Sequence, residues 1–359
     1  MKKMTIVKVL LVIVAILSIM YATVVYSNFE FIRHWRNIWI ETAMTTGEHQ
    51  WLATAFFPRD MIDEVMAGIV TTTDADDEIM DLVSSKKFED KYYSAEVGEL
   101  DDAGNKIYAI NEQNRLAIVE IKGETYRGKA VLVFDPSLVE IAMTNQKGVR
   151  GENVQTIMKK NDAIIAVNAS GFGDPNGQGS GGTIMGASRN SKGDWGTYTD
   201  TMDTIAFDIQ DRLLVGRRGS WNEWAIRDAC QFNPSLIING KQNVEGTAGW
   251  GLQPRTAIGQ REDGTVIIMV IDGRQPTHSV GATMNDLVYE FQKYDVINAA
   301  ACDGGSSSIM GYDGNIITKC SSPQVGGRYL PNAFIVKRVS DERIQKSAVV
   351  LDSNNSKMY

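Results

Sequence analysis

The chain begins with its longest apolar stretch. Residues Val9–Tyr26 contain no charged side chain, and Lys2, Lys3 and Lys8 precede them. As a helix these 18 residues would be about 27 Å long, close to the thickness of a bilayer core. Lysines on the N-terminal side predict that the rest of the chain lies outside the cytoplasm. We therefore predict a transmembrane signal anchor over residues 1–26, with the C-terminal domain extracytoplasmic. A cleaved signal peptide is the alternative, although its apolar part would be long and no good small-x-small site follows.

Helical spacing continues after this span. Apolar residues recur near helical spacing in two stretches, Phe29, Ile32, Trp35, Ile38 and Trp39, and then Ile62, Val65, Met66 and Ile69. Tryptophan rings just beyond a span favour the membrane interface. The pattern predicts a juxtamembrane helical stalk and linker over residues 27–85. Two interpretations stay open: a stalk that could form a homo-oligomer, or helices packed on the main domain. The polar, acidic segment Thr71–Asp77 is the predicted linker.

From Lys86 the pattern changes to short strands. Asn114–Ile121 and Lys129–Phe134 are β-branched and alternate between apolar and polar residues. No segment of 20–50 residues repeats, which argues against a solenoid or propeller. We predict one domain over residues 86–340 and a polar tail over residues 341–359.

Three apolar runs share one design. Ala163–Val167 leads to Asn168, Val266–Ile271 leads to Asp272, and Ile297–Cys302 leads to Asp303, and a glycine follows each within three residues. Each run predicts a buried strand that delivers one polar side chain to a glycine-lined opening. Because the design occurs three times, we expect these strand ends to lie near one another.

A helix is predicted between the second and third runs. Within Thr283–Tyr294, an apolar stripe of Leu287, Val288 and Phe291 follows a capping residue. Strand, helix and strand predict two parallel strands joined by a crossover. Parallel strands would place Asp272 and Asp303 at the same edge of the sheet, where ligands of such sheets bind.

A hairpin is predicted before the Val266 strand. Asp263–Gly264 is a strong signal for a two-residue turn. In that register Arg255 lies opposite Asp272, and the two side chains form a charge-assisted pair. The pair could be catalytic or a structural salt bridge.

Composition narrows the functional classes. The net charge is −8 at pH 7 and no basic cluster contains interleaved aromatic residues, so we predict no nucleic-acid partner. The three cysteines, Cys230, Cys302 and Cys320, allow at most one disulfide, and Cys302 is the predicted free thiol. The histidines are far apart and no HExxH or CxxC motif occurs, so we predict no metal site.

Several ordered motifs resemble the phosphodiester glycosidase family. They are Pro254–Gly259, Val270–Arg274, Ser279–Thr283, Asn298–Ser306 and Arg328–Ala333, and Asn168–Phe172 matches the family pattern loosely. The resemblance covers residues 123–336 and depends on the order of the motifs, because each alone is weak. Ser170 stands where the family often has glycine, which would narrow the opening. Cys302 replaces an aliphatic residue, which would change the packing.

The resemblance implies hydrolysis of a sugar-1-phosphodiester at the anomeric bond, releasing free sugar and a phosphomonoester. It also implies a domain built on a mixed β-sheet. With the N-terminal segments, the expected fold class is α+β: a mixed β-sheet core with flanking helices, preceded by a transmembrane helix and a helical stalk.

Candidate site residues follow from what this reaction needs. Asp303 is the first candidate for the carboxylate that activates water or stabilises the developing cation, and Asp272 is the second, as its partner or as the group that orients Arg255. The candidate substrate-binding residues are Arg274 and Arg328, with Arg255, for phosphate; Gly304, Gly305 and Ser306 for phosphate or sugar; and Asn168 and Gly171 for sugar. The arginines could instead be ordinary surface residues, and Asn168 a loop cap. His278 is a possible proton carrier.

No cofactor is predicted. The glycine-rich segment 171–182 lacks the features of a nucleotide-binding loop and could be a lid or a plain surface loop. Asp174 and Asn176 within it could contact calcium, but two oxygen ligands are too few to predict a site.

The leading functional prediction is an extracytoplasmic, membrane-anchored hydrolase that cuts sugar-1-phosphodiesters in envelope polymers or glycans. Its partners are then a sugar-phosphate or glycan substrate and the membrane. The alternatives are a non-catalytic glycan-binding or scaffold protein of exopolysaccharide or cell-envelope assembly, and an enzyme that transfers the sugar to another acceptor. The sequence leaves the sugar, the aglycone and the oligomeric state open.

Overall fold

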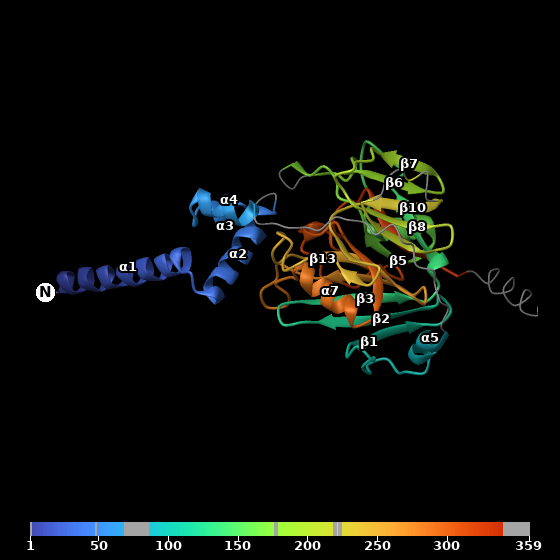
Figure 1. Ribbon diagram of the computed structural model, residues 1–359, viewed down its shortest axis with the longest axis horizontal. Coiled ribbons are helices and arrows are strands. Elements are labelled where there is room, and N and C mark those ends of the chain that lie inside the picture. The colour runs from blue at the N-terminus through green and yellow to red at the C-terminus, as the bar shows by residue number, and fades with distance from the viewer. Residues whose placement is uncertain are drawn as a thin grey trace, which may run out of the picture.

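The computed structural model describes residues 2–46, 49–67, 86–175, 179–217, 221 and 225–339 (Figure 1). Helix α1 (Lys2–Tyr26) contains the stretch Ile6–Tyr26, which is long and apolar enough to cross a membrane. A signal sequence near an N-terminus has the same length and composition. In Figure 1 this helix projects away from the rest of the molecule.

Three short helices follow α1. They are α2 (Glu30–Met44), α3 (Trp51–Thr54) and α4 (Arg59–Ala67), and they pack around a small core that includes Ile40, Phe57 and Ile62. The end of α2 contacts the main domain, where Thr42 Oγ1 accepts a hydrogen bond from Leu252 N over 2.9 Å. The end of α2 is therefore packed on the domain, and a homo-oligomer through this segment stays a prediction. The predicted linker Thr71–Asp77 and the tail 341–359 lie outside the described residues.

Three antiparallel sheets build the main domain. The first has the order β1 (Lys106–Asn111), β2 (Leu116–Lys122), β3 (Arg127–Val133), β14 (Val266–Ile271), β13 (Arg255–Arg261), β15 (Val296–Cys302), β11 (Ser235–Ile238) and β12 (Lys241–Gln242). The second is β7 (Gly193–Gly196), β6 (Ala187–Asn190), β10 (Ile226–Gln231), β8 (Thr204–Asp208) and β9 (Leu213–Gly216). The third is β17 (Asn315–Ile316), β16 (Met310–Tyr312), β5 (Ala163–Asn168), β18 (Asn332–Lys337) and β4 (Val139–Met143).

The main core lies where the three sheets meet. Ile268 of β14, Phe207 of β8 and Phe334 of β18 belong to one buried cluster. The alternate residues of β14, such as Ile267, pack on the other face of the first sheet, together with residues of helices α5 (Lys86–Tyr93) and α7 (Met284–Gln292). Helix α6 (Val154–Asn161) packs on the third sheet. The predicted α+β class is confirmed. Strand β14 is apolar at every position, which fits its burial on both faces.

The three predicted strands and the helix between the last two are present. They are β5, β14, β15 and α7, and Thr283 caps α7 in a reciprocal capping box with Asp286. Strands β14 and β15 run in the same direction, as predicted, but β13 lies between them and is antiparallel to both. The hairpin partner of β14 thus occupies the position that an adjacent parallel strand would take.

The predicted register of the hairpin is wrong by one residue. Arg255 pairs with Ile271, not with Asp272, because the connection is a three-residue turn closed by a hydrogen bond from Arg261 N to Thr265 O. Gly264 has φ +86°, the left-handed conformation that such a turn requires. The predicted Arg255–Asp272 pair does not form, since each side chain has other partners.

Candidate functional site

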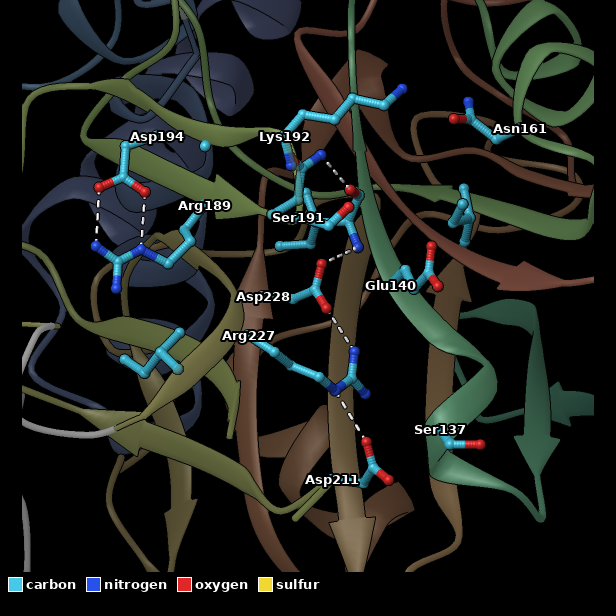
Figure 2. A pocket seen from close by; sticks show the side chains of 15 residues that line it. Ser137, Glu140, Asn161, Arg189, Ser191, Lys192, Asp194, Asp211, Arg227 and Asp228 are labelled. Carbon is cyan, nitrogen blue, oxygen red and sulfur yellow. Dashed lines mark hydrogen bonds and ion pairs between the residues drawn. The ribbon is translucent and has the colours of Figure 1, made fainter. Parts of the chain in front are cut away.

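Among the described residues, two cavities are candidates for the site, and in the larger one charged side chains are paired with one another. This cavity, of about 800 Å³, is lined by residues that include Arg227, Asp228, Asp211, Arg189 and Asp194. Figure 2 shows Arg227 between Asp211 and Asp228, at 2.9 and 2.5 Å, and Arg189 against Asp194, at 2.7 Å. We call it the Arg227 cavity. Because these charged side chains neutralise one another, the arrangement is that of a structural ion-pair network.

The second cavity, of about 690 Å³, contains most of the predicted site residues and is called the Asp303 cavity here. It lies at the C-terminal end of β15, among the loops beside that end. Seven predicted residues line it: Asp303, Arg255, Arg274, Gly304, Gly305, Ser306 and Arg328. Three others, Asp272, Asn168 and Gly171, are buried and lie outside its described lining.

Asp303 is held at the end of β15 by backbone hydrogen bonds. Its N–H donates to Ala169 O over 2.8 Å, and its C=O accepts from Asn168 Nδ2 over 2.6 Å. Burial raises the pKa of the Asp303 carboxyl from 3.8 to about 7, while Ser307 and Arg328 oppose the rise and Asp174 adds to it. Near neutral pH this carboxyl can therefore both give and accept a proton.

This raised pKa gives a stability prediction. The unfolded chain loses the Asp303 proton near pH 3.8 and the folded chain near pH 7, so the ionised form costs stability increasingly over that range and fully above it. Asp303→Asn should therefore raise the melting temperature, with a gain that grows between these two pH values and is constant above them. The corresponding free energy has an upper bound of about 4 kcal/mol. Calorimetry across this range measures it, and a gain independent of pH would contradict the assigned pKa.

Asn168 positions Asp303 and does not face the cavity. Its side chain is fully buried. Its Oδ1 accepts hydrogen bonds from Thr256 Oγ1 over 2.8 Å and from Ile309 N over 3.1 Å, while its Nδ2 holds the Asp303 carbonyl. Because the side chain is buried and both its oxygen and its nitrogen are bonded within the protein, its observed role is to hold the Asp303 backbone, and the predicted contact with sugar stays a prediction.

Arg255 is a buried cation that lines the cavity. Its Nε donates to Ala282 O over 3.0 Å, and its Nη2 donates to Trp250 O and Gly251 O over 2.8 and 2.7 Å. Among the residues that the structure describes, no carboxylate pairs with it. Burial, and secondly Arg274, lower the pKa of Arg255 to about 9, so the side chain remains charged at neutral pH. A buried charge held only by carbonyl dipoles favours an anion bound beside it.

Arg274 lies against the turn that follows Asp303. Its Nε and Nη2 donate to Gln253 Oε1 over 3.1 and 2.8 Å. A Cβ atom at Gly305 would lie 3.2 Å from Arg274 Nη2, and Gly305 has φ +60°. At Gly304 a Cβ would lie 2.9 Å from Pro254 O. The two glycines therefore allow Arg274 and the backbone at Pro254, just before β13, to approach the turn after Asp303 closely.

Arg328 is paired with Asp174. Its two terminal nitrogens contact the Asp174 carboxylate at 2.9 and 2.7 Å, and Nη1 also donates to Ser306 Oγ over 3.1 Å. This pairing lowers the pKa of Asp174, which stays ionised at neutral pH. Arg328 lines the cavity with its terminal nitrogens paired to Asp174, and its predicted role in binding phosphate stays a prediction. Asn176, the other suggested calcium ligand, lies outside the described residues.

Asp272 supports a loop of the cavity and does not form a carboxylate pair within it. Its Oδ2 lies 2.8 Å from His278 Nε2, and its Oδ1 accepts from Lys319 N over 2.8 Å. Residues 321–324, which follow Lys319, line the cavity. Asp272 is thus a positioning residue. The predicted partnership with Asp303 is not seen, because the Asp272 carboxylate is bonded to His278 and Lys319.

Gly171 and Ser170 lie beneath the cavity. A Cβ at Gly171 would lie 3.2 Å from the Phe232 ring, so this glycine makes room for an aromatic side chain that lines the cavity. Gly171 itself lies outside the described lining, and its predicted contact with substrate stays a prediction. Ser170 N donates to Asn332 Oδ1 over 2.9 Å, and Asn332 Nδ2 donates to Ser170 Oγ over 2.9 Å. Because Ser170 is buried there, it does not narrow the opening.

Other residues that line the cavity were not among the predicted site residues. Aromatic walls come from Phe172, Phe232 and Trp250, and one edge comes from Thr45, Thr46 and His49 of the N-terminal segment. Asp174 was considered only for calcium. Gln253 stands directly before the Pro254–Arg255 motif, which could have indicated it. No sequence signal connects residues 45–49 with a cavity formed mostly by residues after 170.

The comparisons with known proteins agree with this site. The family model described as phosphodiester glycosidase matches residues 161–337, which include Asp303, Arg255, Arg274 and Asp174. The chain thus resembles the phosphodiester glycosidase family over this segment. The resemblance that the motifs indicated is thereby confirmed, and the Asp303 cavity lies in the phosphodiester glycosidase segment except for its N-terminal edge.

Individual relatives are distant. The chain is 30% identical over 196 residues to the SPbeta prophage-derived uncharacterized protein YomE of Bacillus subtilis (strain 168), a match that covers 52% of this chain and 29% of that protein. A hypothetical protein from Synechocystis has a similar fold, with TM-score 0.51 and 15% identity over 64% of this chain and 63% of that one. The zebrafish N-acetylglucosamine-1-phosphodiester alpha-N-acetylglucosaminidase catalytic domain, auto-inhibited by its pro-peptide, has TM-score 0.47 and 18% identity over 76% of this chain and 90% of that one.

Proposed function

We propose that the protein hydrolyses the anomeric bond of sugar-1-phosphodiesters. It does so on the outer face of a membrane, in which α1 anchors the protein. The observation that carries the proposal is that one cavity contains both Arg255, a buried cation without a carboxylate partner, and Asp303, a carboxyl of raised pKa. The unpaired charge of Arg255 suits the binding of an anionic substrate. The raised pKa of Asp303 suits proton transfer beside that substrate.

The phosphate of the substrate would lie at Arg255 and Arg274. Because carbonyl groups hold Nε and Nη2 of Arg255, its Nη1 is the nitrogen left to donate charge-assisted hydrogen bonds to phosphate oxygens. As the bond between the anomeric carbon and the phosphate oxygen breaks, negative charge grows on the departing phosphate. The two arginines then stabilise the transition state more than the substrate.

Asp303 would act on the water. In its ionised form it accepts a proton from the water that attacks the anomeric carbon. The phosphomonoester is a good leaving group, so a strong proton donor is not required. The aromatic side chains of Phe172, Phe232 and Trp250 would contact the apolar face of the sugar.

The direct experiment is a substrate screen with the full-length protein in detergent. We expect release of free sugar and phosphomonoester from a glycosyl-1-phosphodiester or from a nucleotide sugar used as a surrogate. Tight binding without turnover across the panel would favour the alternative, a glycan-binding or scaffold protein. Transfer of the sugar to an added acceptor, with no reaction in water, would favour a transferase.

The pH profile tests the role of Asp303. Because the ionised carboxylate accepts the proton, kcat/KM should rise as the pH increases through about 7, the pKa of Asp303 in the free protein. A nucleotide sugar is a suitable substrate, since its phosphates stay ionised across this range. A profile that falls through the same pH would make Asp303 a proton donor and contradict the proposed role.

A further inference from the structure

The helices beside the membrane span carry a surface of exposed aromatic residues. Phe31, Trp35 and Trp39 lie at positions i, i+4 and i+8 of α2 and are 66%, 44% and 44% exposed. Trp51 of α3 and Phe56 after it are 57% and 41% exposed. We call these five residues the aromatic surface. Single exposed apolar residues are common in proteins, but a group of large rings indicates a surface that contacts something.

Most of this surface lies outside the core of α2–α4, and only Trp39 packs its ring on Phe57 of that core, with 5.5 Å between the ring centroids. Their small core consists of other residues, among them Ile40, Ala53 and Phe57, which are almost fully buried. Of the tryptophans, Trp39 donates its indole N–H to Leu52 O over 3.1 Å and leaves much of its ring exposed. Amphipathic rings of this type concentrate at the boundary between lipid acyl chains and water.

The aromatic surface is fixed to the end of the candidate span. Arg36 Nη1 donates to Val25 O over 2.6 Å and to Ser27 O over 3.2 Å. Tyr21 of α1 donates its hydroxyl to Phe56 O over 2.9 Å. When α1 crosses a bilayer, these contacts hold α2–α4 next to the bilayer surface, as their position between α1 and the main domain also indicates (Figure 1).

The same helices are fixed to the Asp303 cavity. Gln253 Nε2 donates to Thr42 O over 2.8 Å, and a Cβ atom at Gly251 would lie only 2.5 Å from Thr42 N. The loop that α2 touches is the loop whose carbonyls, at Trp250 and Gly251, hold Arg255. Thr45, Thr46 and His49 form one edge of the cavity. Trp51 of the aromatic surface follows His49 by two residues.

We propose that the aromatic surface lies in the outer interface of the bilayer, and that the Asp303 cavity takes sugar-1-phosphodiesters whose aglycone is a membrane lipid. The second part rests on the proposed function and names the substrate class of that site. A lipid-linked phosphodiester is presented at the depth of the lipid headgroups. Helix α2 has 15 residues and is at most about 22 Å long, so the cavity edge at its end stays close to the membrane span. When α2 lies along the bilayer surface, this edge is near the depth of the lipid headgroups.

The reaction on such a substrate balances without another reactant. The bond between the anomeric carbon and the phosphate oxygen breaks, and the bonding electrons stay with the oxygen. Water supplies a hydroxyl group to the anomeric carbon and a proton that Asp303 accepts and then returns to solvent or to the phosphate. The products are a free sugar, which leaves into water, and a lipid monophosphate, which stays in the membrane.

Tryptophan fluorescence tests the membrane contact independently of activity. The full-length protein is placed in phosphatidylcholine nanodiscs with brominated acyl chains, which quench rings at the interface. We expect quenching that decreases in the double variant Trp35→Phe/Trp51→Phe and persists in the control Trp195→Phe, which alters β7 of the second sheet. Equal quenching in wild type and double variant would overturn the proposal. So would absence of quenching together with cross-linking of two copies through this surface.

Activity tests the substrate class. The rate on a lipid-linked sugar phosphodiester in the same nanodiscs should fall at least about fivefold in Trp35→Ser/Trp51→Ser, while the rate on a soluble nucleotide sugar stays the same. Equal rates on the lipid-linked substrate, or equal losses on both, would reject a membrane-lipid aglycone. If the wild-type protein cleaves neither substrate, the proposed function and this substrate class both fail, and the fluorescence measurement still decides the membrane contact.

Discussion

Replacing Asp303 by asparagine should reduce kcat on a sugar-1-phosphodiester by about 10²- to 10⁴-fold, the usual contribution of a positioned acid or base. Asparagine has nearly the same shape but cannot accept the proton from water. The backbone bonds to Ala169 and Asn168 remain, so the cavity keeps its form. Steady-state kinetics with the full-length variant measure the effect.

The matched control for this variant is Asp228→Asn. Asp228 is another aspartate whose pKa is raised by burial, but it lies in the Arg227 cavity, where Ile141 N and Arg227 hold it. Its replacement should leave kcat within about twofold of wild type, since it touches no part of the Asp303 cavity. Unchanged turnover in Asp303→Asn would remove this residue from the mechanism. Equal losses in both variants would indicate a general effect on folding.

Replacing Arg255 should mainly weaken binding of the phosphate. In Arg255→Lys the charge remains, but the guanidinium geometry is lost, and with it one charge-assisted hydrogen bond to phosphate. Such a bond contributes about 1.5–3 kcal/mol, so the inhibition constant of the phosphomonoester product should rise about 10- to 150-fold. Competition kinetics or calorimetry with that product gives the value.

The control for Arg255→Lys is Arg227→Lys, which changes an arginine already neutralised by Asp211 and Asp228. We expect product affinity to be unchanged there. Undiminished affinity in Arg255→Lys would mean that the phosphate binds elsewhere, and a melting temperature measured in parallel separates this outcome from partial unfolding.

The strands and the main site residue could be predicted because local patterns determine them. A run such as Val266–Ile271 is apolar at every position, which fits a strand buried on both faces, and Asp303 stands out as a carboxylate between such a run and two glycines. The helix between β14 and β15 was predictable from its cap and its apolar stripe.

Features that depend on one residue of register were not predictable. Asp263–Gly264 fits both a two-residue and a three-residue turn, and the choice moved Arg255 from Asp272 to Ile271. The pairing of Arg328 with Asp174 joins residues 154 positions apart and left no local pattern. The cavity edge at residues 45–49 depends on how α2 packs on the loop at Gly251, a tertiary contact that helical periodicity does not encode.

The most direct test of the central claim is hydrolysis of a sugar-1-phosphodiester in water enriched in oxygen-18. In the proposed mechanism Asp303 and its water act at the anomeric carbon, and the arginines act at the departing phosphate. The bond that breaks is therefore the one between the anomeric carbon and the phosphate oxygen. Mass spectrometry should find the heavy oxygen in the released sugar and none in the phosphomonoester. Heavy oxygen in the phosphomonoester would mean attack at phosphorus and would contradict the proposed mechanism.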